Sequence, residues 1–149
     1  METNKLYCKS SEEMKEINDK SIDLIITSPP YNIDINYGNK WEKGKKLEPK
    51  GKKYKDNLSE DNYRILLEKV FSECTRVLKE DGSFYLNMKS RLINESLVPP
   101  FWVLEFLKEF YLKNIIIWSF DWGGSTNKRF SSRYEFVLFL TKDKKNWTF

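Results

Sequence analysis

The strongest hydrophobic pattern along the chain follows Ser59 and has the period of an α-helix. Apolar residues recur there at spacings of three and four on one face: Tyr63, Leu66, Leu67, Val70, Phe71, Cys74, Val77 and Leu78. Ser59 can cap the first turn with its hydroxyl, and Gly82 suits a left-handed turn at the other end. The pattern therefore predicts an amphipathic helix that begins after Ser59 and ends at residues 80–82.

Two weaker patterns predict further helices. Residues 10–18 begin with serine and continue with glutamates, which is typical of a short helix with a capped, acidic first turn. Pro99 and Pro100 can open another helix, because proline is tolerated in a first helical turn. We expect that helix to run to about Tyr111, with Trp102 in the core.

Four runs rich in β-branched and aromatic residues predict strands at residues 21–27, 83–88, 114–120 and 134–141. Strands that alternate with helices are typical of an α/β fold with a mostly parallel sheet. The last two runs have no helix between them, so we expect an antiparallel C-terminal hairpin at one edge of that sheet. Trp118 lies on the third run and is expected in the core.

Length and composition indicate one soluble domain and exclude several kinds of chemistry. The 149 residues are 40% hydrophobic and 32% charged, which is ordinary for a globular protein. The chain has no histidine and only two cysteines, which excludes serine–histidine and cysteine–histidine catalysis and argues against a metal site. Cys8 and Cys74 have no metal or redox spacing, so we expect reduced thiols and a cytoplasmic protein.

The net charge of +4 is unevenly distributed. Residues 40–55 contain eight lysines and two glutamates, which makes this segment alone +6. Such a block suits a polyanion such as a nucleic acid, although a solvated surface loop is the alternative. We expect residues 34–58 to form a mobile basic loop. The candidate contacts to a nucleic-acid backbone are Lys43, Lys45, Lys46, Lys52 and Lys53.

Residues 27–32, Thr-Ser-Pro-Pro-Tyr-Asn, carry the candidate chemistry. They follow a predicted buried strand, and open α/β sheets bind their ligands at the carboxyl ends of strands. Pro30 holds Pro29 in an extended conformation, and since neither residue has an N–H group, the Pro29 carbonyl can accept from a ligand. Ser28 offers a second acceptor, and Tyr31 offers a ring on which a planar base can stack. The alternative is a Pro-Pro turn that only ends the strand.

Two acceptors beside a stacking ring suit the exocyclic amine of a nucleobase. Ser28 and Pro29 would hold its two N–H groups and free the nitrogen lone pair for attack on a methyl group. No histidine base is needed, because the proton can leave after the methyl group has arrived. A sulfonium methyl donor on the far side would complete an in-line transfer. A base inside a duplex would have to be flipped out to reach this site.

The same residues resemble a known family. Residues 21–33 resemble the catalytic motif of site-specific DNA amino-methyltransferases, and residues 76–83 and 133–142 resemble segments that follow it in that family. The resemblance implies a partial Rossmann-like methyltransferase sheet, S-adenosylmethionine as cofactor and DNA as substrate. It assigns catalysis to Ser28, Pro29, Pro30 and Tyr31. It further assigns Asn32 and Tyr134 to the base pocket, and Ser10 and Thr27 to cofactor binding.

Two features of that family are missing. Its members bind S-adenosylmethionine through a Phe-x-Gly-x-Gly turn, and none of the six glycines here stands in that pattern. Many members also carry Gly-Asp where this chain has Lys9 and Ser10. When the catalytic motif comes first, in the β-type order, the glycine turn and the target-recognition region come later. We therefore interpret residues 1–149 as the catalytic-motif half of a methyltransferase domain. We expect a second polypeptide to carry the other half, with a truncated or cleaved chain as the alternatives.

The expected function is methyl transfer from S-adenosylmethionine to a base amine of DNA. Within the resemblance, Ser-Pro-Pro-Tyr is commoner among cytosine-N4 enzymes, so Ser28 favours cytosine N4 and leaves adenine N6 as the alternative. Related Pro-Pro-Tyr motifs also occur in methyltransferases of RNA and of protein glutamine. The alternative from another class is a non-catalytic nucleic-acid-binding module that lacks the cofactor turn.

Overall fold

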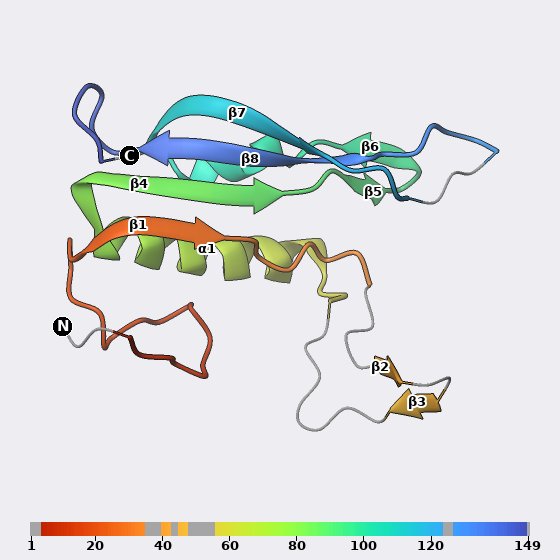
Figure 1. Cartoon of the computed structure of the whole chain (residues 1–149), viewed down its shortest axis with the longest axis horizontal. Coiled ribbons are helices and arrows are strands. Elements are labelled where there is room, and N and C mark those ends of the chain that lie inside the picture. Colours follow the sequence, from red (N-terminus) through yellow and green to blue (C-terminus); the bar gives the residue numbers. More distant parts are fainter. Residues whose placement is uncertain (1–3, 35–39, 43–44, 48–55, 124–126, 149) are drawn as a thin grey trace.

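The computed structural model describes residues 4–34, 40–42, 45–47, 56–123 and 127–148, and its centre is a four-stranded sheet (Figure 1). The strands, in spatial order, are β1 (Ile22–Thr27), β4 (Leu78–Met88), β8 (Tyr134–Thr141) and β7 (Tyr111–Ser119). β1 is parallel to β4, whereas β8 is antiparallel to both β4 and β7. Strands β1, β4 and β7 thus run in one direction, and the expected α/β sheet with an antiparallel C-terminal hairpin is confirmed.

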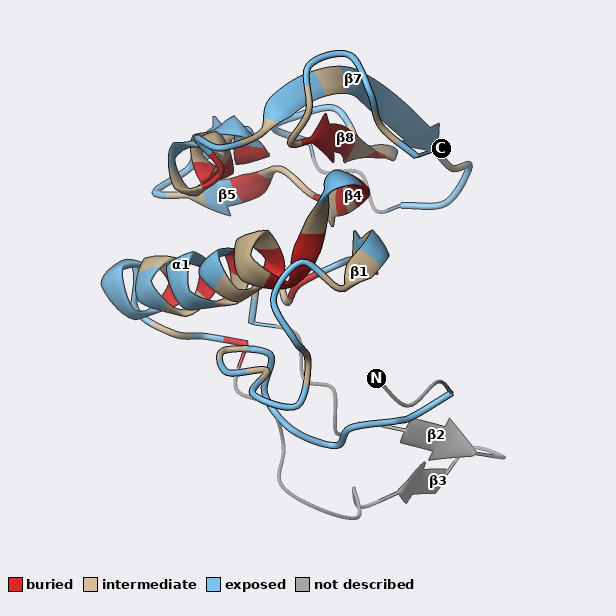
Figure 2. Cartoon of the chain, turned by 90° about the vertical axis from the view of Figure 1, so that its left-hand side faces the viewer, coloured by how far each residue is buried: buried red, intermediate tan, exposed pale blue. Residues whose placement is uncertain are grey.

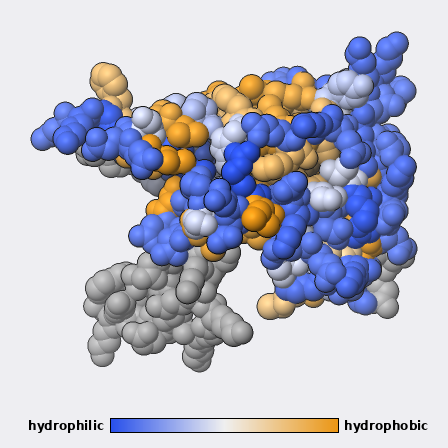
Figure 3. All heavy atoms as spheres, turned by 180° about the vertical axis from the view of Figure 1, so that it is seen from behind, coloured by the Kyte–Doolittle hydropathy of each residue, from blue (hydrophilic) through white to orange (hydrophobic). Residues whose placement is uncertain are grey.

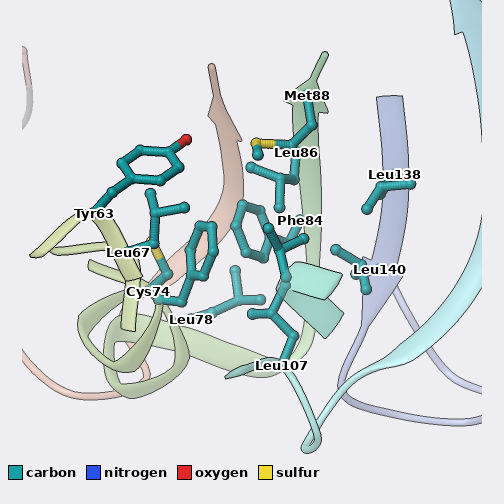
Figure 4. Close-up of a cluster of buried hydrophobic side chains, with 12 residues drawn as sticks. Tyr63, Leu67, Cys74, Leu78, Phe84, Leu86, Met88, Leu107, Leu138 and Leu140 are labelled. Carbon is teal, nitrogen blue, oxygen red and sulfur yellow. The ribbon is translucent and has the colours of Figure 1, made fainter. Parts of the chain in front are cut away.

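The predicted amphipathic helix is present as α1 (Glu60–Val77). Ser59 caps it, since the Ser59 hydroxyl accepts from the Asn62 N–H at 3.3 Å. The buried side of α1 meets β4 and β8 in one hydrophobic core (Figure 4), which includes Tyr63, Leu67, Phe71, Cys74, Phe84, Leu86, Met88, Leu138 and Leu140. Burial raises the pKa of the Cys74 thiol to about 12, so this thiol packs as a protonated, apolar group.

The end of α1 differs from the sequence prediction. The chain passes from the helix straight into β4, because Leu78 already has an extended backbone, with φ of −72° and ψ of 135°. Gly82 lies within β4 and has no positive φ, so the expected left-handed exit at Gly82 is wrong. A Cβ at position 82 would lie 2.7 Å from Leu78 Cδ1 and 3.0 Å from the Asp23 carbonyl oxygen. The glycine is needed for the close approach of β1.

The prediction of a helix at residues 10–18 is also wrong, because turns occupy this segment. The backbone of the segment is hydrogen-bonded to side chains of α1 instead. The Met14 N–H donates to Glu73 Oε2 at 2.6 Å, and the Arg76 guanidinium donates to the carbonyls of Met14 at 3.0 Å and Ile17 at 2.9 Å. Hydrogen bonds from Arg76 and from the Met14 N–H lower the pKa of Glu73 to about 2, which keeps this carboxylate ionised. A helix this short is marginal by itself, so tertiary bonds decide its conformation.

Between β4 and β7 the chain forms a hairpin and a short helix. β5 (Arg91–Ile93) pairs with β6 (Ser96–Val98), and the two residues of their turn, Asn94 and Glu95, have φ of 49° and 64°. The helix expected up to about Tyr111 is a 3₁₀ helix, η1 (Pro100–Phe106). It is shorter than expected because residues 107–110 form a turn before β7 begins at Tyr111.

The lysine-rich segment contains a second small hairpin. β2 (Lys40–Glu42) pairs antiparallel with β3 (Lys45–Leu47), where the sequence predicted only a basic loop. Residues 35–39, 43–44 and 48–55 lie outside the described residues, as do Lys43, Lys52 and Lys53.

The helices α1 and η1 cover one face of the sheet and leave the other face open (Figures 1 and 2). Strand register places Leu24 and Ile26 of β1 on the open face, together with Ile116 and Trp118 of β7. Their exposed fractions are 50%, 73%, 45% and 53%, so the expectation of a core position for Trp118 is wrong. Figure 3 views the molecule from behind. It shows further hydrophobic surface along the upper part of the molecule, where β7 lies. None of the described helices is long and apolar enough to cross a membrane.

Candidate active site after strand β1

Residues 27–32 leave β1 at its carboxyl end, where Thr27 pairs with Leu86 of β4. Pro29 is buried, and no group within the described residues donates a hydrogen bond to its carbonyl. The next carbonyl is used, since Pro30 accepts from the Tyr63 hydroxyl of α1 at 2.7 Å. The helix thus holds the motif through Pro30, and the described residues donate no hydrogen bond to the Pro29 oxygen. A ligand-binding role of this oxygen stays a prediction.

Ser28 and Tyr31 belong to a polar group that also contains Asn87 of β4 and Glu135 of β8; we call these four residues the motif cluster. Tyr31 Oη lies 2.8 Å from Ser28 Oγ and donates to Glu135 Oε2 at 2.9 Å. Asn87 Nδ2 donates to Tyr31 Oη and to Glu135 Oε2, both at 2.9 Å. Ser28 is exposed, whereas Glu135 is only 9% exposed. The motif cluster therefore leads from the surface of the motif into the sheet.

Asn87 and Glu135 are site residues that the sequence reasoning missed. Each interrupts an apolar stretch of its strand, residues 84–88 in β4 and 134–140 in β8, and a polar group in such a stretch costs free energy unless it is hydrogen-bonded. A polar residue within an apolar stretch is therefore the sequence signal that could have identified Asn87 and Glu135. Lys89, just beyond β4, adds a cation 3.9 Å from Glu135 Oε1.

Asn32 anchors the motif to the segment before α1. Its side chain exchanges two hydrogen bonds with the backbone of Leu58, donating at 2.9 Å and accepting at 2.7 Å. The N–H groups of Asn32 and Ile33 donate to the carboxylate of the buried Asp56 at 2.8 Å and 3.2 Å. Asn32 has a positive φ of 56°, a conformation that asparagine tolerates better than most residues. These contacts hold the chain in position as it leaves the motif.

A groove of about 720 Å³ opens beside the motif, and Asn32 and Ile33 line part of it. Its other walls carry two exposed aromatic side chains, Trp122 at 70% exposure and Phe130 at 98%, next to the cation of Arg129. Trp122 stacks on Phe120 with ring centroids 4.6 Å apart. Large apolar side chains exposed to this extent mark a binding surface when they gather at one place.

Arg91 also lines this groove, but its charge is already compensated. The guanidinium donates to both oxygens of Glu60, at 2.7 Å and 2.8 Å, and stacks over the Tyr63 ring at 4.7 Å. Hydrogen bonding to Arg91 holds the pKa of Glu60 below its usual range. Arg91 therefore links β5 to α1 through this ion pair and forms part of the groove wall.

Comparison with known proteins identifies the family of this chain. The N6/N4 methyltransferase model, described as DNA methylase, matches residues 22–149. This chain belongs to the DNA methylase family. Among curated relatives, the DNA adenine methyltransferase YhdJ of Escherichia coli is 37% identical over 92% of the chain and 40% of its own length. The type II methyltransferase M.HpaI of Haemophilus parainfluenzae is 30% identical over 97% of the chain and 41% of its own length.

Solved structures of other methyltransferases have the same fold. The cytosine-N4-specific PvuII DNA methyltransferase superposes with a TM-score of 0.57 at 19% identity, over 95% of this chain and 49% of that one. TTHA0409 of Thermus thermophilus, in complex with S-adenosyl-L-methionine, gives 0.58 at 18% identity, over 93% and 53%. The likeness confirms the expected methyltransferase sheet. This DNA methylase chain spans about two fifths of the curated relatives' length and about half of these structures.

The structure does not bring Tyr134 to the motif cluster. Tyr134 precedes Glu135 in β8, and successive side chains of a strand point to opposite faces. Its ring packs edge-on against Phe136 at 5.3 Å, and none of its described contacts is with Ser28 or Tyr31. The role of Tyr134 in a base pocket stays a prediction.

The predicted cofactor residues are likewise not joined by any described contact. The exposed Ser10 hydroxyl donates to Glu12 Oε2 at 2.9 Å, in the segment before β1. Thr27 is the last residue of β1. Lys45 and Lys46 lie on β3, and the other three candidate lysines fall outside the described residues.

Proposed function

We propose that this chain is the catalytic-motif half of a DNA methyltransferase that methylates the exocyclic amine of a flipped-out base, with S-adenosylmethionine as donor. One observation carries the proposal. The Pro29 carbonyl has no donor among the described residues, and it stands next to the exposed hydroxyl of Ser28 at the carboxyl end of β1. Two adjacent acceptors match the two N–H groups of an aromatic amine.

The motif residues would bind and orient the amine. With its N–H groups held by Ser28 and Pro29, the nitrogen lone pair is turned out of the ring system and towards the methyl group. Tyr31 is fixed through its hydroxyl, so its ring is available at a constant angle for stacking with the base. After methyl transfer the amine carries an extra proton, which can leave to water because Ser28 is exposed.

No described contact joins Ser10 to Thr27, and the sequence has no Phe-x-Gly-x-Gly turn to let a backbone approach the cofactor. We therefore assign the donor site and target recognition to the rest of the methyltransferase, supplied by a second polypeptide. Such an enzyme would act on DNA in the cytoplasm.

Two observations bear on which base is methylated. Ser28 in the motif favours cytosine N4 through a family tendency at one position. The 37% identity to an enzyme named a DNA adenine methyltransferase extends over 92% of the chain. The longer match has more weight, so we propose adenine N6 as the target and keep cytosine N4 as the alternative.

The test is to combine this chain with a methyltransferase half that carries the glycine turn, supply labelled S-adenosylmethionine and DNA, and analyse the nucleosides by mass spectrometry. N6-methyladenine is the expected product, and N4-methylcytosine would favour the alternative base. In parallel assays with RNA or protein as the substrate, label that is transferred there but not to DNA would contradict the proposal. DNA binding without any transfer would identify a non-catalytic binding module.

We also propose that DNA lies along the groove, stacked on Phe130 and Trp122, with the lysines of residues 40–55 on its phosphates. Loss of one stacked base costs about 1–3 kcal/mol, so Phe130→Ala should weaken binding about 5- to 150-fold at every salt concentration. Replacing Lys43, Lys45, Lys46 and Lys52 by glutamine should instead flatten the slope of log affinity against log salt by up to about 3.6.

Fluorescence anisotropy with a labelled duplex that has one extrahelical base measures both effects. Leu6→Ala is the matched control for Phe130→Ala, because Leu6 is 96% exposed and lies outside the groove. Equal affinities for the Phe130→Ala variant and the Leu6→Ala control would exclude the groove as the DNA site. An unchanged salt slope in the lysine variant would show that residues 40–55 do not contact the phosphates and are only a solvated surface segment.

A further inference from the structure

We infer that Glu135 sets the direction of the hydrogen bonds in the motif cluster, so that Ser28 meets the substrate base as an acceptor only. The inference rests on the proposed function for the identity of the ligand. It makes Glu135 a positioning residue that acts through Tyr31 and does not itself touch the base.

The direction follows from counting protons. A carboxylate only accepts hydrogen bonds, and a phenol has a single proton to donate. Tyr31 gives that proton to Glu135 Oε2 at 2.9 Å. In the 2.8 Å contact between Tyr31 Oη and Ser28 Oγ, the donor must therefore be Ser28. With its proton committed to Tyr31, the Ser28 hydroxyl has only lone pairs left for a ligand.

Asn87 supports the same direction. Its Nδ2 donates to Tyr31 Oη and to Glu135 Oε2, both at 2.9 Å, so the phenol oxygen receives two protons and can only give its own to Glu135. The other end of the amide, Asn87 Oδ1, is buried and has no partner within the described residues. A buried acceptor without a partner is costly, yet turning the amide would place this oxygen against the Glu135 carboxylate, which can only accept. The cluster keeps the orientation that supplies protons to Tyr31 and Glu135.

The consequence is a choice between kinds of base. Adenine and cytosine present an amine, which donates, where hypoxanthine and uracil present a carbonyl, which accepts. An acceptor-only Ser28 beside the Pro29 carbonyl favours the amine and leaves a keto base facing two oxygens. Sites built around one hydrogen-bond pattern reject the opposite pattern strongly, because buried polar groups are then left unpaired. If Tyr31 lost its acceptor, it could give its proton to Ser28, and Ser28 could turn its own towards a carbonyl.

The test measures this discrimination by binding, without methyl transfer. The full 149-residue chain is titrated with short single-stranded oligo(dA) and oligo(dI), and with oligo(dC) and oligo(dU). Single strands need no base flipping, and paired oligonucleotides have equal phosphate charge, so backbone attraction cancels in the ratio. The unmodified chain should bind the amine oligonucleotide at least about fivefold more tightly than its keto counterpart.

The Glu135 substitution is made in a chain that also carries Asn87→Leu. Without this change, the Asn87 side-chain amide could turn over, and its oxygen could replace the Glu135 carboxylate as the acceptor for Tyr31. The single variant keeps the hydrogen bond from Tyr31 to Glu135, and its amine-to-keto ratio is the reference for the double variant. Asn87→Leu combined with Glu135→Leu should reduce the ratio to within about twofold of unity. Tyr31→Phe offers a second route to the same result, since phenylalanine cannot receive the Ser28 proton, and adding Glu135→Leu to it should change nothing further. Thermal unfolding of each variant checks that it is folded.

Retention of the amine preference in the double variant or in Tyr31→Phe would overturn the inference, as would its absence from the unmodified chain. Methyl transfer is decided separately. A chain that shows the predicted loss of preference but methylates no base in the complete enzyme would contradict the proposed function and leave the role of Glu135 standing.

Discussion

Ser28→Ala is expected to lower the rate of methyl transfer by the complete enzyme about 100- to 1,000-fold, the usual effect of deleting one preorganised hydrogen-bonding group from an active site. Because Ser28 is exposed, the free energy of unfolding of the chain should change by less than about 0.5 kcal/mol in this variant. Single-turnover kinetics on DNA, with chemical denaturation of the same preparation, measure both quantities. Ser96→Ala, at an exposed serine of β6, is the control and should change neither.

Tyr31→Ala should lower the rate by a similar factor, because it removes the stacking ring and also the partner of the Ser28 hydroxyl. Its hydroxyl bonds to Glu135 and Asn87 predict a loss of about 1–2 kcal/mol of folding free energy as well. Specific activity per folded molecule that survives either substitution would show that the motif only ends a strand.

The chain by itself is expected to bind S-adenosylmethionine weakly or not at all and to methylate nothing. Adding a chain with the Phe-x-Gly-x-Gly turn and a recognition region should restore both activities, through a large apolar interface of the obligate kind. The physical reason is the open face of the sheet, where Leu24 is 50% exposed and Ile26 is 73% exposed. Isothermal titration with the cofactor is the direct test, and micromolar affinity without a second chain would contradict it.

The open face can be tested by one substitution. Ile26→Asp should weaken association with the other half more than about tenfold, because the charge would be buried on assembly. It should leave the isolated chain folded, since Ile26 is already exposed. Ile65→Asp is the matched control on the outer side of α1, where isoleucine is 49% exposed and away from the open face. Equal loss of association in both variants would show that the open face is not the interface.

The elements that the sequence predicted correctly are those whose signals are local. The helix α1 has its cap, its apolar stripe and its acidic first turn within one stretch of chain. The strand β8, predicted at residues 134–141, has those bounds in the structure. The motif after β1 was recognisable because its two prolines and its neighbours stand together in six residues. In each case short-range physics is sufficient to decide the structure.

Tertiary contacts decided the rest. Residues 10–18 have the composition of a helix, but their backbone bonds to Glu73 and Arg76, far along the chain. Gly82 looked like a helix end, yet its small size serves the packing of β1 on β4. In both places the local preference amounts to a few tenths of a kcal/mol up to about 1 kcal/mol, which one or two buried contacts outweigh.

The candidate site divides in the same way. Ser28, Pro29 and Tyr31 are neighbours in sequence, and their types alone indicated two acceptors and a ring. Glu135 lies 104 residues from Tyr31 in sequence and Asn87 lies 56 away, so only the register of β4 against β8 brings them to the motif. The sequence predicts which atoms hold an amine. The sheet decided in which direction their hydrogen bonds run, because a buried carboxylate at the end of the chain of bonds leaves Ser28 one orientation.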